Sequence, residues 1–239
     1  MGYRGVAPGT YRVLFLAGAV APYRFASPYY PSVIASAGAV TTAASTVDKV
    51  FEAVGAVLRS ATSSVSDKRE AINVLWGAVN TPARAALRLA LREADASLRL
   101  NAAAGLLAAN DLSALPIATE VLLKNDPTVP DDIVLNLRGA ISRGVTAKEA
   151  IPDLARLEAA RDPATRRAAV TALGRTSAAE AIRHVGDALD DQDFQVRLAA
   201  VRALADLTAQ KERAPSTEAF RADERRWVGY WKDWLGRRP

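Results

Sequence analysis

The chain has 239 residues, half of them apolar, and carries a formal net charge of +5 at pH 7. That is enough apolar material for the core of one elongated domain or of two compact ones. Because the sequence contains no cysteine, disulfides, thiolate metal sites and cysteine nucleophiles are excluded.

The charge is unevenly distributed along the chain. Residues 1–47 contain three arginines and no acidic residue, whereas residues 48–239 contain 28 basic and 26 acidic residues with the two signs interleaved. A nucleic-acid-binding protein needs a concentrated basic face, so the sequence argues against a nucleic-acid partner. Arginine outnumbers lysine by 25 to 6, a bias typical of a GC-rich bacterial genome.

Residues 1–45 form a non-repetitive N-terminal arm. Its segment VLFLAGAV, residues 13–20, has the length of a signal-peptide core, but prolines and an arginine separate it from the cleavage-like Ala35-Ser36-Ala37. We therefore expect no cleavage and a cytoplasmic protein, with an exported or membrane-peripheral protein as the alternative. The chain has no run of 18 apolar residues, so the sequence predicts no transmembrane helix.

The arm holds five of the six tyrosines of the chain. It is too apolar and aromatic to be disordered by composition, and tyrosine is favoured at interfaces. We therefore predict that the arm is a partner-binding or assembly element whose candidate contacts are Tyr11, Tyr23, Tyr29 and Tyr30. The alternative is that the arm caps the N-terminal end of the repeats.

A repeated unit follows over residues 46–208. Small-apolar pairs such as Ala71-Ile72 and Ala200-Val201 place the start positions of five second helices at residues 67, 98, 134, 165 and 196, with spacings of 31, 36, 31 and 31. Landmarks on the preceding helices, at residues 84, 115, 151 and 182, follow the second-helix marks at a constant distance of 17. This pattern predicts an all-α fold, a right-handed α-solenoid of about five helical hairpins. The five extra residues of the third unit fall in 124–132, where two prolines predict a projecting loop.

Each second helix begins with the same polar pattern. A candidate N-cap stands three residues before each start position, at Ser64, Asp95, Asp131, Asp162 and Asp193. One residue after the start positions come Lys68, Arg99, Leu135, Arg166 and Arg197. We predict that the second helices line the concave face and present four arginines to an acidic partner, namely Arg99, Arg166, Arg197 and Arg202. The alternative is a structural ladder of caps and ion pairs between units.

At these positions the chain resembles a known family. Asp193, Val196, Arg197, Ala200 and Leu204 follow a pattern similar to the short HEAT-like repeats named after phycobilisome lyases, and the unit that begins at residue 162 matches nearly as well. The resemblance implies a HEAT-like solenoid. It does not imply one function, because this module serves scaffolds, adaptors and a few enzymes.

After residue 208 the period stops. Residues 216–236 are predicted to form one amphipathic capping helix, begun by Ser216 or Thr217, with one aromatic stripe of Phe220, Trp227, Tyr230, Trp231 and Trp234. A terminal repeat would otherwise expose its apolar face, so we expect this helix to close the stack. The alternative is a helix that lies on a membrane surface.

The sequence contains no recognisable catalytic constellation. His184 is the single histidine, which argues against a protein metal site, and no phosphate-binding loop or nucleophile motif appears. We therefore expect no cofactor and a non-enzymatic protein–protein interaction scaffold, a subunit of a larger assembly. One alternative is a HEAT-like DNA base glycosylase, although Trp76 is the one tryptophan expected on a second helix. Another is a lyase or chaperone for a tetrapyrrole protein.

Overall fold

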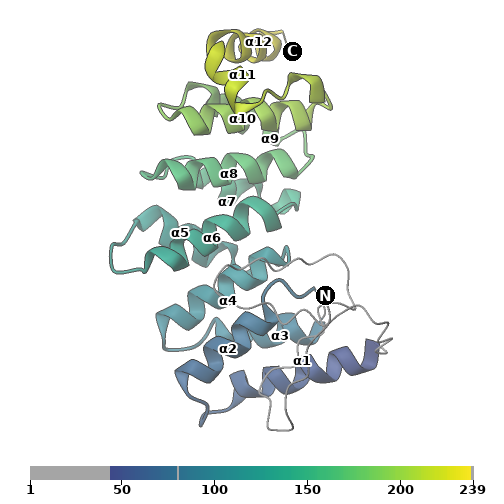
Figure 1. Cartoon of the computed structure of the whole chain (residues 1–239), viewed down its shortest axis with the longest axis vertical. Helices are drawn as coiled ribbons and strands as arrows, with labels where there is room; N and C mark the ends of the chain where they lie inside the picture. The colour runs from purple at the N-terminus through teal and green to yellow at the C-terminus, as the bar shows by residue number, and fades with distance from the viewer. Residues whose placement is uncertain (1–43, 80, 238–239) are drawn as a thin grey trace.

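The structure is a computed structural model that describes residues 44–79 and 81–237. These residues form α-helices and short 3-10 turns and contain no strand. Figure 1 shows the helices stacked in one column, with α1 near one end and α12 at the other. The all-α solenoid expected from the repeat is therefore confirmed.

Successive helices form pairs in which a first helix precedes a second helix. The first helices are α1 (Ala44–Arg59), α3 (Thr81–Ala90), α5 (Leu115–Lys124), α7 (Ile151–Leu157) and α9 (Ala181–Asp187). The second helices are α2 (Val65–Leu75), α4 (Ala96–Ala108), α6 (Asp131–Gly144), α8 (Pro163–Arg175) and α10 (Phe194–Leu207). Each second helix packs against the second helix of the next pair, so these helices form one continuous layer of the column (Figure 1).

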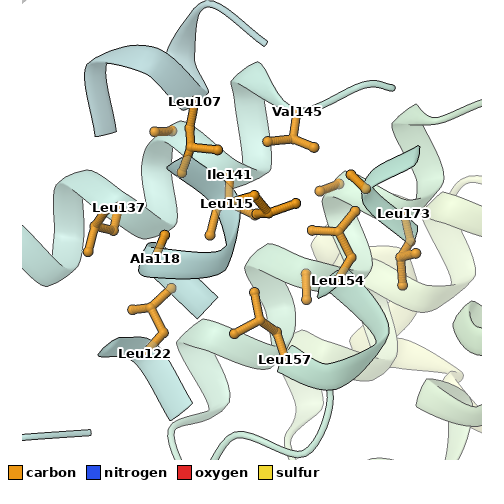
Figure 2. Close-up of a cluster of buried hydrophobic side chains, with 14 of the residues drawn as sticks. Leu107, Leu115, Ala118, Leu122, Leu137, Ile141, Val145, Leu154, Leu157 and Leu173 are labelled. Atoms are coloured by element: carbon orange, nitrogen blue, oxygen red, sulfur yellow. The ribbon is translucent and has the colours of Figure 1, made fainter. Parts of the chain in front are cut away.

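The hydrophobic core runs without interruption from one pair into the next. Figure 2 shows Leu107 of α4, Leu122 of α5, Ile141 of α6, Leu154 of α7 and Leu173 of α8 in a single cluster. Each of these side chains is at most 3% exposed, and burying a leucine or isoleucine stabilises the fold by about 1.5–3 kcal/mol. No pair buries its apolar residues alone, which is why the stack is the unit of stability.

Two glycines permit close contact between neighbouring second helices. A Cβ added at Gly174 of α8 would lie 2.6 Å from the Cβ of Ala203 in α10. A Cβ at Gly144, the last residue of α6, would lie 2.2 Å from the carbonyl oxygen of Leu107 in α4. Any larger residue at either position would push the two helices apart.

Four of the five predicted N-caps are confirmed. The side-chain oxygens of Ser64, Asp95, Asp162 and Asp193 each accept a hydrogen bond from a backbone amide in the first turn of the following helix. The prediction for Asp131 is wrong, because Pro130 is the N-cap and Asp131 is the first residue of α6. The carbonyl of Pro130 accepts the amide hydrogens of Ile133 and Val134, at 3.0 and 3.2 Å.

The register predicted for the third pair is therefore wrong by one residue. Ile133 is 2% exposed and occupies the buried place that the repeat assigned to Val134, which is partly exposed. The cause is the proline, whose fixed φ lets it end the loop and start the helix one residue earlier than an aspartate cap at 131 would. As a result Leu135, expected beside Arg166 in the basic row, corresponds to Arg167 instead.

The predicted projecting loop is confirmed. α5 ends at Lys124 and is followed by its C-cap Asn125, which has φ of 48°, and residues 124–128 are all exposed. Asp126 stabilises the turn, because its Oδ1 accepts hydrogen bonds from the amide and the hydroxyl of Thr128 at 2.8 and 2.7 Å.

The segment predicted as one C-terminal helix forms two helices. α11 spans Thr217–Ala222 and α12 spans Glu224–Gly236. Between them Asp223 has φ −150° and ψ 66°, values outside the α-helical region. Its Oδ1 accepts the amide hydrogen of Arg226 at 3.1 Å. Asp223 thus ends one helix and caps the next, while Ser216 caps α11 as expected.

Candidate functional site

The candidate site predicted from the sequence is the row of arginines on the second helices. Arg99, Arg166 and Arg197 make one recurring contact, in which Nη1 donates to two backbone carbonyls at the end of the preceding loop. The distances are 2.7 and 2.7 Å for Arg99, 2.9 and 3.1 Å for Arg166, and 2.7 and 2.8 Å for Arg197. Each guanidinium therefore satisfies carbonyl groups that the turn between two helices leaves without a partner.

The same row also joins neighbouring pairs of helices by charge. Arg166 holds the carboxylate of Asp191 with two hydrogen bonds, from Nε at 2.6 Å and from Nη2 at 2.8 Å. Lys68 pairs with Glu93 at 2.8 Å, and Arg197 pairs with Glu224. The hydrogen bonds from Arg166 lower the pKa of Asp191. The carboxylates that pair with this row are Glu93, Asp191 and Glu224, and none of them is an N-cap.

Arg99 and the third pair depart from the ladder. Arg99 makes no ion pair within the described residues, whereas the equivalent residues Lys68, Arg166 and Arg197 each make one. Between α6 and α8 the connection comes instead from Arg138, whose Nη2 lies 2.9 Å from Oδ2 of Asp162 and whose Nε donates to Thr165 at 3.1 Å. One signal in the sequence points to this role, an arginine at a position where the other second helices have an apolar residue.

Arg202, the fourth predicted arginine, binds the C-terminal segment. Its Nε donates to the carbonyl of Pro215 at 3.0 Å and its Nη2 to Oγ1 of Thr217 at 3.4 Å. All four predicted arginines are thus engaged within the chain, and their contact with a partner stays a prediction. The predicted arm contacts, Tyr11, Tyr23, Tyr29 and Tyr30, lie outside the described residues.

The aromatic residues of the C-terminal segment close one end of the stack. Phe220 and Trp231 are fully buried, and the Phe220 ring lies 5.2 Å from the ring of Phe194 in α10. Tyr230 donates a hydrogen bond to Gln210 at 2.5 Å, and Lys232 pairs with Asp190. α12 therefore covers the last pair of helices, as Figure 1 shows.

Glu158, His184 and Asp187 lie close together at α7 and α9, and this cluster was not predicted from the sequence. Oε2 of Glu158, at the end of α7, lies 3.7 Å from Nδ1 of His184 on α9. Burial, together with the nearby charge of Asp187, raises the pKa of Glu158 to about 8. Glu158 is one residue past the helical core pattern of α7, so nothing in the sequence marks its burial.

The described residues bear on three kinds of site: a base-binding groove, a metal site and a membrane-spanning helix. Trp76, the aromatic residue considered for a base-binding groove, is the C-cap of α2 and packs against the core. Among residues 44–79 and 81–237 no group of three or more histidine, aspartate or glutamate residues could hold a metal ion. No helix among them is long and apolar enough to span a bilayer.

Comparison with known proteins agrees with the geometry. The family of HEAT repeats matches residues 145–230, which run from the loop before α7 into α12. No curated protein matches the chain. The matched segment contains the pairs α7/α8 and α9/α10 with their ion-pair ladder, and the remaining pairs continue the same stack (Figure 1). Residues 145–230 are therefore similar to HEAT repeats, and the described residues have the fold of an α-solenoid.

Proposed function

We propose that the protein is a non-enzymatic interaction scaffold, a subunit of a larger assembly that it joins through its N-terminal arm and the second-helix face. We further propose that residues 46–208 comprise five repeats of the short phycobilisome-lyase type, that residues 1–45 are the arm, and that residues 216–236 are the cap. HEAT repeats are commonly scaffolds, because a stack of helical pairs offers a long side face to a partner.

The observation that carries this proposal is the unequal closure of the two ends of the stack. At the C-terminal end α11 and α12 bury Phe220 and Trp231 over the last pair. At the other end no helix of the described residues lies beyond α1 and α2, and Val65 of α2 is 46% exposed. The tyrosine-rich arm precedes α1 directly, so a partner that binds the arm would lie beside this end of the stack.

The association itself is tested by light scattering coupled to size-exclusion chromatography. We expect the full-length chain to form an assembly with copies of itself or with a co-purified partner. Deletion of residues 1–45 should remove this association and leave a helical protein that melts cooperatively, because each repeat contacts only its neighbours.

A full-length variant provides the control for the deletion. Serine at Tyr11, Tyr23, Tyr29 and Tyr30 keeps the chain length and removes the aromatic contacts, and it should also lose the association. A full-length protein that is monomeric without any partner, together with a truncated protein that aggregates or melts far lower, would instead make the arm an N-terminal cap.

A further inference from the structure

One stripe of α10 is covered by the chain's own C-terminal segment. Phe194, Leu198 and Arg202 are each four residues apart and so share one face of the helix. Phe194 contacts the ring of Phe220, and Arg202 donates to the carbonyl of Pro215. Leu198 lies between these two contacts and is only 2% exposed.

The covering segment also brings negative charge to this stripe. Glu218 belongs to the first turn of α11. Its own backbone amide and the hydroxyl of Ser216 hold the pKa of Glu218 below its usual range, with further attraction from Arg221 and Arg202. The chain therefore contains an example of how this face binds a segment. An arginine holds the segment's backbone and attracts its carboxylate, and an apolar side chain lies underneath.

No described segment of the chain is seen to cover the equivalent stripe on the two preceding second helices. Leu198 is the fifth residue after its N-cap, and the fifth residue is Arg167 in α8 and Leu135 in α6. Two helical turns further along the same face lie Arg175 of α8 and Arg143 of α6. Leu135 is 67% exposed, the most exposed large apolar side chain of the described residues. The three arginines are exposed and make no hydrogen bond or ion pair through their guanidinium groups with any described residue. We name this surface the bare stripe: Leu135, Arg143, Arg167 and Arg175.

We propose that the bare stripe binds an acidic segment of a partner protein, which places an apolar side chain on Leu135 and carboxylates at Arg167 and Arg175. The inference rests on the proposed scaffold function and adds the location and the chemistry of the partner. Arginine favours this role because its planar fork holds carboxylates bidentately, as Arg166 holds Asp191.

Two other occupants are less suited to this surface. The chain's own arm carries three arginines and no acid, so it would be repelled by the exposed arginines. A nucleic acid would offer phosphates to the arginines but no apolar side chain to Leu135, which would stay exposed. An acidic protein segment satisfies both the arginines and the leucine.

The test is fluorescence anisotropy on the full-length chain with a labelled amphipathic peptide, in which glutamates recur at every fourth position around a central leucine. The matched peptide has lysine in place of each glutamate. We expect the acidic peptide to bind and the basic one not to bind. The double variant Arg167→Glu with Arg175→Glu should weaken binding about fivefold or more, since two attractions become repulsions. Leu135→Ser should weaken it by about twofold to fivefold.

The control is Arg183→Glu with Arg225→Glu, which changes the net charge equally but lies on α9 and α12, where both residues are exposed. It should change the affinity by less than about twofold. Equal loss in both double variants, or equal binding of the basic peptide, would overturn the proposal. The proposal would also be overturned if a single-stranded oligonucleotide bound more tightly than the acidic peptide and the Arg167→Glu, Arg175→Glu variant abolished that binding. Because the peptide needs no arm, failure here with arm-dependent assembly intact would remove this inference and leave the scaffold function standing.

Discussion

The raised pKa of Glu158 predicts that the protein loses stability as the pH rises. In the folded chain burial raises this pKa from 4.5 to about 8, so the folded state binds the proton more tightly than the unfolded state. The contribution of Glu158 is therefore fully present below the unfolded pKa and is lost as the pH rises towards 8. This sign is opposite to that of a carboxylate held in an ion pair, such as Asp191.

The magnitude follows from the pKa and from the exposure of the side chain. One pKa unit corresponds to about 1.4 kcal/mol, so the rise to about 8 sets an upper limit of roughly 5 kcal/mol. The side chain keeps 20% of its exposure, and water reduces the cost of the charge. We therefore expect the free energy of unfolding to fall by about 1–3 kcal/mol between about pH 5 and about pH 9 through this group.

Glu158→Gln removes the ionisable group and nearly preserves its shape. Urea unfolding followed by circular dichroism should show the variant equal to the wild type near pH 5 and more stable by about 1–3 kcal/mol near pH 9. The matched control is Glu70→Gln, at an exposed position of α2. This variant should change the free energy of unfolding by the same amount near pH 5 and near pH 9. A variant that is less stable than the wild type near pH 9 would refute the reasoning, because it would show that ionised Glu158 is stabilised by His184.

Four further substitutions test the stack. Asp193→Ala should cost about 1 kcal/mol of unfolding free energy, whereas Asp131→Ala should cost less than about 0.5 kcal/mol, since Pro130 is the cap there; equal losses would contradict the register. Arg166→Met should cost about 1–3 kcal/mol by removing the donors to the carbonyls of Ala160 and Arg161 and both guanidinium hydrogen bonds to Asp191, and an unchanged urea midpoint would count against the ladder. Trp231→Ala should cost about 3–5 kcal/mol, and a smaller effect would mean that α12 does not close the core.

The period of the sequence was sufficient to predict the stack because both rest on the same residues. Small apolar residues such as Ala169 and Ala200 recur where second helices meet, and both are fully buried. The N-caps were equally visible, since a helix start needs an acceptor that few residue types provide. The prediction failed at Asp131 because a proline can begin a helix without any side-chain acceptor.

The contacts between distant residues could not be predicted in the same way. Arg197 pairs with Glu224, which lies beyond the end of the period, and Glu158 lies beside His184 of the next first helix, α9. The division of the C-terminal helix at Asp223 depends on a single residue with non-helical φ and ψ, and helical spacing of the aromatic residues does not reveal it.

The arginines of this protein show why recurrence in a repeat sequence points to structure before function. Arg166 and Arg197 recur at the unit length, and both are used between units, because a contact that every unit must make with the next appears once in each unit. Leu135 and Arg167 stand at equivalent positions yet differ in kind, so no contact common to all units can require them. Positions that break the period while staying exposed are therefore where selection by a partner, rather than by the stack, would act. We therefore propose that a partner binds on α6 and α8, whereas Arg166 and Arg197 join neighbouring units of the stack.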